Sequence, residues 1–209
     1  MSGATADTAG LARGLIETGA VQIDRQPRFL WSSGIRSPIY CDLRLVMGDP
    51  VLRGRVADRM ADLIRREFPG TELIAGTASA AIAPAAWIAE RMRLPMSYVR
   101  DKSKQHGMMR RIEGGPVAGR RVSLVEDTVS TGGSAIRSAL AIREEEGDLA
   151  GIVSIFSYGF EKSARGFREA GIEHRNLIGF GDLLDAAGLE SGSDERAELE
   201  VWRDRTGRA

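Results

Sequence analysis

The sequence predicts an α/β fold in which a central parallel sheet is flanked by helices. Two observations indicate this class: short apolar runs alternate with amphipathic segments between residues 73 and 178, and loops of small or polar residues follow several of the apolar runs. Such alternation is typical of strands joined by right-handed helical crossovers. Ligands of these sheets bind where the carboxyl ends of the strands meet, so that edge is the expected site.

The apolar periodicity places each element in turn. We expect strands at 73–75, 96–99, 122–125, 151–157 and 176–178, with helices at 81–92, 134–146 and 161–170 between them. Before these, Leu11 and Leu15 lie on one face of a short helix that ends near Gly19, extended chain follows, and a strand covers 39–43. Asp49 and Pro50 predict a helix start, with Asp49 as N-cap and Pro50 at the first helical position.

Composition narrows the classes of function. The 209 residues suffice for one α/β domain, which we divide into an N-terminal helix and hood (1–45), a catalytic core (46–185) and a charged tail (186–209). Lys plus Arg and Asp plus Glu number 29 each, so no net charge favours nucleic acid or a membrane. A single cysteine, Cys41, and the lack of a signal-peptide pattern predict a cytoplasmic protein.

The segment 122–134 carries the clearest chemical pattern. Glu126 and Asp127 stand at the predicted end of a buried strand, and Ser130, Thr131, Gly132, Gly133 and Ser134 lead into a helix. Backbone N–H groups at such a helix start suit a phosphate. Paired carboxylates would repel a phosphate, so they suit two sugar hydroxyls or a hydrated divalent cation instead. The pattern indicates a ribose 5-phosphate site; the alternative is a plain turn with a capping serine and an exposed acidic pair.

The segment 100–121 is strongly basic and glycine-rich, with too few apolar residues for a regular buried element. Two interpretations are equally supported: a mobile lid over a polyphosphate, or a solvated loop or hairpin. The charged residues of 186–209 predict a short surface helix or frayed tail without a catalytic role, since Leu199 and Trp202 form only a narrow apolar stripe.

Five segments resemble the type I phosphoribosyltransferases, and within them the orotate phosphoribosyltransferases. They are Ser-Gly-Ile-Arg-Ser-Pro-Ile-Tyr (33–40), Ile-Ala-Gly-Thr-Ala-Ser (74–79), Tyr-Val-Arg-Asp-Lys-Ser-Lys-Gln-His-Gly (98–107), Ile-Glu-Gly (112–114) and the acidic-pair motif at 122–134. The acidic pair by itself indicates the superfamily, whereas the first and third segments together point to orotate. The resemblance covers residues 10–185 and implies a type I phosphoribosyltransferase-like sheet, a small N-terminal hood and a long flexible basic loop.

The resemblance also implies a reaction, in which ribose 5-phosphate passes from phosphoribosyl pyrophosphate (PRPP) to orotate with Mg2+, carried mainly by the pyrophosphate. It implies a homodimer whose basic loop reaches the neighbouring subunit. The residues implied to bind PRPP are Thr77, Ala78, Arg100, Lys104, His106, Glu126, Asp127, Thr128, Val129, Ser130, Thr131, Gly132, Gly133 and Ser134; those implied to bind orotate are Ser130 and Arg36; those implied to be catalytic are Lys104, His106 and Asp127.

Some positions depart from the family pattern. Ser32 and Asp101 stand where some members have lysine, and no arginine follows Tyr158 where some members bind the orotate carboxylate. Two alternatives therefore stay open at this point: a phosphoribosyltransferase for a purine or another pyrimidine, and a regulator that senses PRPP. The neutral net charge and the segment 104–106 argue against the regulator.

Overall fold

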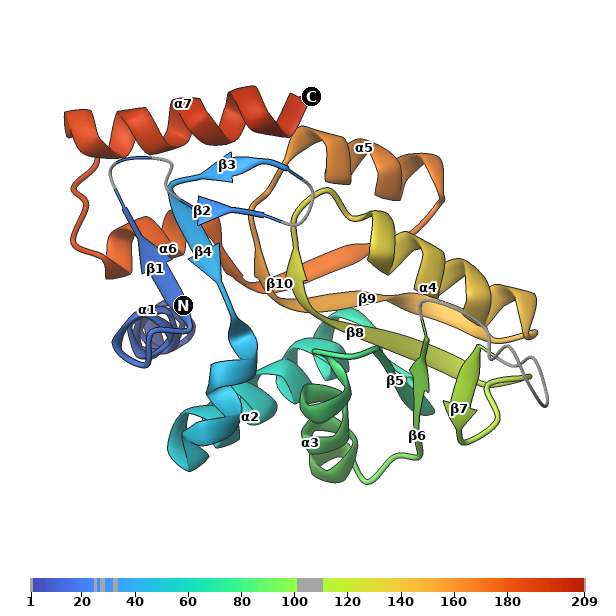
Figure 1. Ribbon diagram of the computed structural model, residues 1–209. Helices are drawn as coiled ribbons and strands as arrows, with labels where there is room; N and C mark the ends of the chain where they lie inside the picture. The colour runs from blue at the N-terminus through green and yellow to red at the C-terminus, as the bar shows by residue number, and fades with distance from the viewer. Residues whose placement is uncertain (1, 25, 27–28, 32–33, 101–110, 209) are drawn as a thin grey trace.

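The computed structural model describes residues 2–24, 26, 29–31, 34–100 and 111–208. A six-stranded sheet with the order β10-β9-β8-β5-β6-β7 forms its centre, and every neighbouring pair is parallel except β6 with β7. Helices cover both faces of this sheet (Figure 1). The predicted α/β class is therefore confirmed. Within the described residues, no helix combines the length and apolar character needed to cross a bilayer.

The elements follow one another along the chain as strands and helices. The strands are β1 (Val21–Ile23), β2 (Phe29–Leu30), β3 (Arg36–Ser37), β4 (Ile39–Cys41), β5 (Leu73–Thr77), β6 (Met96–Val99), β7 (Ile112–Gly114), β8 (Arg121–Val129), β9 (Asp148–Ser157) and β10 (His174–Gly179). The helices are α1 (Ser2–Glu17), the 3-10 helix η1 (Leu43–Gly48), α2 (Pro50–Glu67), α3 (Ile82–Met92), α4 (Gly133–Glu144), α5 (Glu161–Glu169), α6 (Phe180–Ala186) and α7 (Asp194–Arg208).

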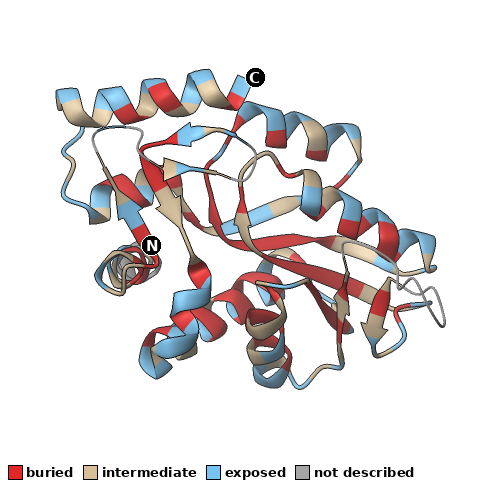
Figure 2. Cartoon of the chain, viewed as in Figure 1, coloured by how far each residue is buried: buried red, intermediate tan, exposed pale blue. Residues whose placement is uncertain are grey.

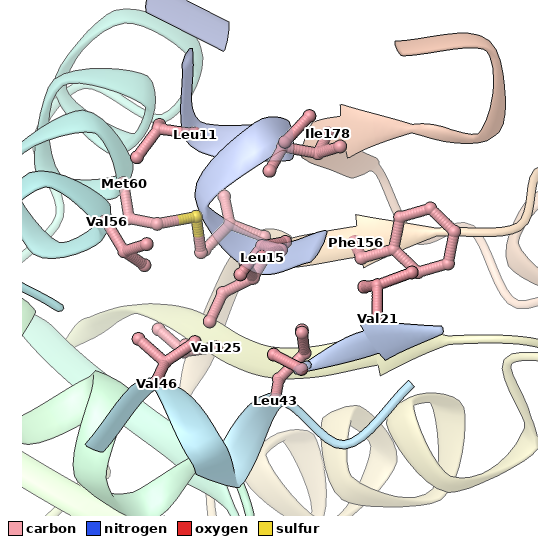
Figure 3. Packing of buried hydrophobic residues seen from close by; sticks show 14 of the residues in the cluster. Leu11, Leu15, Val21, Leu43, Val46, Val56, Met60, Val125, Phe156 and Ile178 are labelled. Atoms are coloured by element: carbon pink, nitrogen blue, oxygen red, sulfur yellow. The ribbon is translucent and has the colours of Figure 1, made fainter. Parts of the chain in front are cut away.

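Two apolar layers lie on opposite faces of the sheet. One joins the sheet to α1, α2, α3, α6 and α7, and the other joins it to α4 and α5. Figure 2 shows the central strands as continuously buried, as expected for parallel strands covered on both faces. Close packing of the first layer brings Leu11 of α1, Met60 of α2 and Phe156 of β9 into one cluster (Figure 3). This packing fixes the N-terminal segment on the same sheet that carries the site.

Strands β1–β4, residues 21–41, form two small antiparallel ribbons, which we call the hood. Strand β1 pairs with β4, and β2 pairs with β3. Val21 is buried in the first apolar layer together with Leu43 of η1, which follows β4 (Figure 3). The strand expected at 39–43 is therefore shorter, because the chain turns into η1 after Cys41 and Asp42.

Several expected boundaries were wrong for identifiable reasons. Strand β8 does not end at Val125 but continues to Val129, because its pairing with β9 extends to Ser157. The acidic pair therefore lies within the strand. The segment 100–121 contains an edge strand, β7, which pairs antiparallel with β6. Helix α1 begins at Ser2, and the tail is a docked helix, α7, with Leu199 and Trp202 buried.

The start of α2 illustrates how local sequence determines an element. Asp49 accepts hydrogen bonds from the backbone N–H groups of Val51 and Leu52, both at 2.9 Å, and Pro50 occupies the first helical position. The carboxylate satisfies donors that the helix itself leaves unpaired. This confirms the capping predicted from the Asp-Pro pair.

We expect the Asp49→Ala variant to lose about 1 kcal/mol of unfolding free energy, because two N–H groups lose their acceptor. Urea denaturation followed by circular dichroism measures this loss. Asp49→Ser, which retains a capping oxygen, should stay within about 0.5 kcal/mol of the parent. Equal stability of the alanine variant and the parent would show that the cap contributes nothing.

Candidate active site

The carboxyl edge of the sheet brings together segments that are far apart in sequence. Gly76 of β5 lies beside Val125 of β8, so Thr77 and Glu126, one residue further on, end up at the same edge. On the other side, Thr77 pairs with Val99 of β6, and Arg100 comes next. The turn after β5, the end of β8 and the end of β6 therefore meet, as the parallel topology requires.

Glu126 and Asp127 occupy an unfavourable environment. Glu126 is 5% exposed, and its Oε2 atom has no hydrogen-bond partner among the described residues. Burial raises the pKa of Glu126 well above its usual value, and the neighbouring Asp127 raises it further. Burial also raises the pKa of Asp127, against the opposing influence of its hydrogen bond with Glu126. Ligand hydroxyls that donate to these carboxylates would relieve this unfavourable state.

Two buried hydroxyls beside the pair are also without partners in the described part of the chain. They are Thr77 Oγ1 at the end of β5 and Thr128 Oγ1 on β8. Buried polar atoms are nearly always paired, so a cluster of unpaired ones indicates a place where a polar ligand binds. These atoms belong to two of the segments that the sequence singled out.

The phosphate-loop candidate, residues 130–134, leads from β8 into α4. Gly132 caps α4 with φ +79°, a left-handed conformation that favours glycine. A Cβ atom at this position would also lie 3.1 Å from Phe167 Cζ, so α5 packs closely against the turn. Ser130 and Thr131 are partly buried, whereas Ser134 is exposed in the first turn of α4. The N–H groups at the start of α4 are thus available to an anion.

The turn after β5 packs against strand β6 on one side and against the start of helix α3 on the other. The Ala78 N–H donates to the Val99 carbonyl at 2.8 Å, and the Ala78–Ser79 peptide bond is cis. A Cβ atom at Gly76 would lie 2.7 Å from the Ala81 carbonyl oxygen, so glycine is required for the close approach of β5 and α3. Thr77 is buried and Ala78 is partly exposed at the edge.

Arg100 marks the beginning of the basic segment. Its guanidinium forms an ion pair with Glu113 of β7 at 3.0 Å. Its backbone N–H donates to the Arg111 carbonyl at 2.8 Å. Residues 100 and 111 are therefore adjacent and lie at the sheet edge beside the turn that follows β5. Residues 101–110, with the predicted Lys104 and His106, lie outside the described residues. The residues on either side, β6 with Arg100 and Arg111 with β7, pair antiparallel as the two strands of a hairpin do.

A cavity of about 460 Å3 lies next to the acidic pair, between the hood and the sheet. Its walls are Leu30, Trp31, Tyr40, Cys41, Asp127, Thr128, Ser130 and Tyr158. Rings dominate the hood side, whereas carboxylate and hydroxyl groups of 127–130 line the sheet side. This combination suits a flat polar ring that extends from a sugar held at Asp127.

Sequence reasoning missed most of the cavity wall. Tyr158 and Cys41 join its two sides, since the Tyr158 hydroxyl lies 3.3 Å from Cys41 Sγ. Burial raises the pKa of the Cys41 thiol to about 12, which rules out a thiolate at neutral pH. Tyr40 belongs to the motif at 33–40, so its inclusion there was the available signal. Trp31 carried no such signal, because its role depends on contacts with residues distant in sequence.

Arg36 is not brought to this cavity. Its side chain is exposed on β3 and is absent from the described cavity wall, whereas its backbone carbonyl accepts a hydrogen bond from Trp202 Nε1. The expected contact of Arg36 with orotate therefore stays a prediction. Arg44 of η1 is a cation that sequence reasoning missed: its charge lowers the pKa of Asp127, and it forms an ion pair with Asp42 at 2.6 Å.

Comparison with known proteins decides the family. No family model matches the sequence. The chain is 42% identical over 197 residues to the orotate phosphoribosyltransferase of Staphylococcus saprophyticus, which covers 93% of this chain and 97% of the relative. This chain belongs to the orotate phosphoribosyltransferase family.

Solved structures agree with this family. The orotate phosphoribosyltransferase of Aeropyrum pernix superposes with a TM-score of 0.76 at 27% identity, over 87% of this chain and 99% of that one. That of Mycobacterium tuberculosis in complex with PRPP superposes with a TM-score of 0.66 at 25% identity, over 85% and 98% of the two chains. The type I phosphoribosyltransferase fold is thus confirmed for this transferase.

Oxygen atoms of the transferase site fit a hydrated magnesium ion. Among the described residues, no three His, Cys, Asp or Glu side chains gather into a metal-binding group. Glu126 and Asp127 nevertheless present carboxylate oxygens, one of them unpaired, and Mg2+ prefers oxygen ligands while keeping several waters. The chain therefore offers contacts from one side and leaves the remaining ligands to water or substrate.

We expect the Glu126→Gln variant of the ligand-free transferase to be more stable than the parent by roughly 1–3 kcal/mol near pH 7.5. The folded protein binds the Glu126 proton more tightly than the unfolded chain does, because its pKa is raised. The stability contributed by this group is therefore complete below about pH 4.5 and is lost as the pH rises through the folded pKa. Thermal unfolding measured from pH 4.5 to 8.5 should show a difference that grows with pH.

Glu90→Gln is the matched control, because the Glu90 side chain is 77% exposed on α3. It should stay within about 0.5 kcal/mol of the parent at every pH. A Glu126→Gln variant whose stability advantage shrinks as the pH rises would contradict the raised pKa.

Proposed function

We propose that this transferase moves the ribose 5-phosphate group of PRPP to orotate, giving orotidine 5'-phosphate and pyrophosphate. The observation that carries this proposal is the ring-lined cavity beside the buried acidic pair, at a sheet edge that also presents a helix start. A base, a ribose and phosphates thus have adjacent places. In the reaction the bond from ribose C1 to the pyrophosphate oxygen breaks, and a bond from C1 to a ring nitrogen of orotate forms.

We assign the ribose hydroxyls to Glu126 and Asp127, because unpaired buried carboxylate oxygens suit hydroxyl donors. Thr128 and Val129 continue the same strand toward the 5-phosphate. The 5-phosphate is assigned to the loop and helix start formed by Ser130, Thr131, Gly132, Gly133 and Ser134. On this assignment Glu126→Gln removes an acceptor for the ribose while stabilising the ligand-free protein.

We assign the pyrophosphate to Thr77, Ala78 and Arg100, which meet at the same edge. Bond cleavage develops positive charge on the ribose and negative charge on the departing pyrophosphate, so cations and N–H groups around the leaving group lower the barrier. Lys104 and His106 are proposed to supply such donors, and Asp127 to face the reacting carbon. When bound, Mg2+ supplies further positive charge to the pyrophosphate.

We assign orotate to the cavity, with Ser130 as a hydrogen-bonding partner from the sheet side. The ring face would pack between side chains of the hood and Tyr158. We further propose a cytoplasmic homodimer in which the basic loop reaches the neighbouring subunit. The proposal that residues 101–110 act as a lid is supported by the described residues that flank them, because Arg100 and Arg111 are adjacent at the sheet edge beside the turn after β5.

The function is tested by incubating the purified protein with Mg2+, PRPP and one of orotate, uracil, hypoxanthine or adenine. We expect orotate absorbance to fall with matching release of pyrophosphate, and the other bases to remain unchanged. Consumption of another base instead of orotate would transfer the proposal to that base. Binding of PRPP without consumption of any base would favour a sensing regulator.

For the lid, we expect Lys104→Ala to lower turnover about 100-fold or more, because a donor to the leaving group acts mainly in the transition state. Its unfolding temperature should match that of the parent. Lys102→Ala is the matched control from the same segment and should retain most of the turnover. Parallel losses of stability and turnover in Lys104→Ala would indicate a structural lysine.

A further inference from the structure

Helix α7 is firmly attached to the core at several points. Arg196 forms an ion pair with Asp185 at the end of α6, and a second one within α7, with Glu200, holds its side chain in place. Arg203 lies over the Phe180 ring at 5.2 Å, and Arg208 is 3.5 Å from Glu161 of α5. These contacts hold the helix along its length. Of the two expectations for this segment, a short surface helix or a frayed tail, the structure has a helix that is docked on the core.

The far end of α7 packs closely against the chain that follows β9. A Cβ atom at Gly207 would lie 3.0–3.1 Å from side-chain and backbone atoms of Phe160, so this position admits no larger residue without displacement. Leu199 is 3% exposed in the first apolar layer. Figure 1 shows α7 lying beside strand β3 of the hood. Helix α7 thus contacts the hood and is also attached to α5 and α6.

Trp202 makes the connection between α7 and the hood. Its Nε1–H donates to the Arg36 carbonyl of β3 at 3.0 Å. Its ring centroid lies 6.1 Å from that of Trp31, in an edge-to-face arrangement, and 6.3 Å from that of Tyr158. Trp31 and Tyr158 both line the cavity. One side chain of α7 therefore touches two rings of the cavity wall and a strand of the hood.

The hood needs such support. Its strands are two or three residues long and form two separate two-stranded ribbons, and ribbons of this kind are marginally stable alone. Trp31 holds a further hydrogen bond, from Nε1 to the Ile39 carbonyl at 3.3 Å, and its ring is 4.9 Å from that of Tyr158. The position of the hood thus depends on contacts between rings from three distant parts of the chain.

We propose that α7 is a brace for the base pocket and that Trp202 is a positioning residue for orotate. Trp202 fixes Trp31 and strand β3, which in turn set the distance between the hood and the sheet end. This inference rests on the assignment of orotate to the cavity. It also predicts an asymmetry between the substrates, because the proposed ribose and phosphate positions belong to β5, β8 and α4, whereas the polar and ring contacts given above for Trp202 are with β3, Trp31 and Tyr158.

The test compares Trp202→Phe with the parent in steady-state kinetics. Phenylalanine retains a ring against Trp31 and Tyr158 but lacks the N–H donor. Strand β3 therefore loses its hydrogen bond to α7. We expect KM for orotate to rise about 3- to 10-fold, the range of one lost hydrogen bond. KM for PRPP and kcat should each change less than about 2-fold. Trp202→Leu, which loses the ring as well, should raise KM for orotate further.

Val201→Ala is the matched control, because Val201 is 64% exposed on the same helix. It should leave both KM values unchanged. Equal rises in the two KM values, or unchanged KM for orotate in a folded Trp202→Leu variant, would overturn the brace.

Hydrogen exchange of ligand-free protein tests the brace independently of activity. Trp202→Phe should accelerate exchange in a peptide covering residues 34–41 and leave β8 and β9 unchanged. Unchanged exchange in that peptide would overturn the brace even if orotate is the substrate. If the parent consumes no orotate, the proposed function fails, whereas faster exchange would still support the brace.

Discussion

Two carboxylates side by side on a buried strand are the constraint around which this site is built. Glu126 and Asp127 lose hydration on burial, and the charge of Asp127 raises the pKa of Glu126 further, while Oε2 of Glu126 has no hydrogen-bond partner within the described residues. Such an arrangement is unfavourable for folding alone and becomes favourable when donors from a ligand fill it. The protein tolerates this unfavourable burial because the extensive apolar layers on both faces of the sheet stabilise the fold. The unpaired buried atoms of the ligand-free structure are thus consistent with the proposed binding of sugar hydroxyls.

The sheet topology distributes the remaining tasks over separate elements. Because β5, β6 and β8 are parallel neighbours, their following loops reach the same edge from different directions. In the proposed assignment, the ribose lies at the end of β8, a phosphate at the start of α4, and the leaving group between the turn after β5 and the base of the β6–β7 hairpin. The base pocket is completed by the hood and by Tyr158, which follows β9. Substrate specificity and chemistry therefore reside in parts of the chain that can change independently.

Local sequence determined some of these features, and contacts across the fold determined others. The Asp-Pro cap of α2 and the loop entering α4 depend on neighbouring residues, so both could be predicted. The length of β8 could not, because it is fixed by pairing with β9 as far as Ser157. Nor could the cavity wall, where the rings of Trp31 and Tyr158 meet and Trp202 packs against both. Prediction succeeded where a residue acts on its neighbours and failed where its surroundings come from elsewhere.

The environment of Cys41 has a practical consequence for studying this protein. It is the sole cysteine of the sequence, and its thiol lies against the Tyr158 hydroxyl with a pKa of about 12. Alkylating reagents react with thiolates, so we expect the raised pKa to make this partly buried thiol react slowly at neutral pH. The native chain is therefore a ready background for site-directed labelling, in which a cysteine introduced at an exposed position takes up a fluorophore or spin label selectively. Distances across the β6–β7 hairpin could then be followed in solution without first altering the wall of the base pocket.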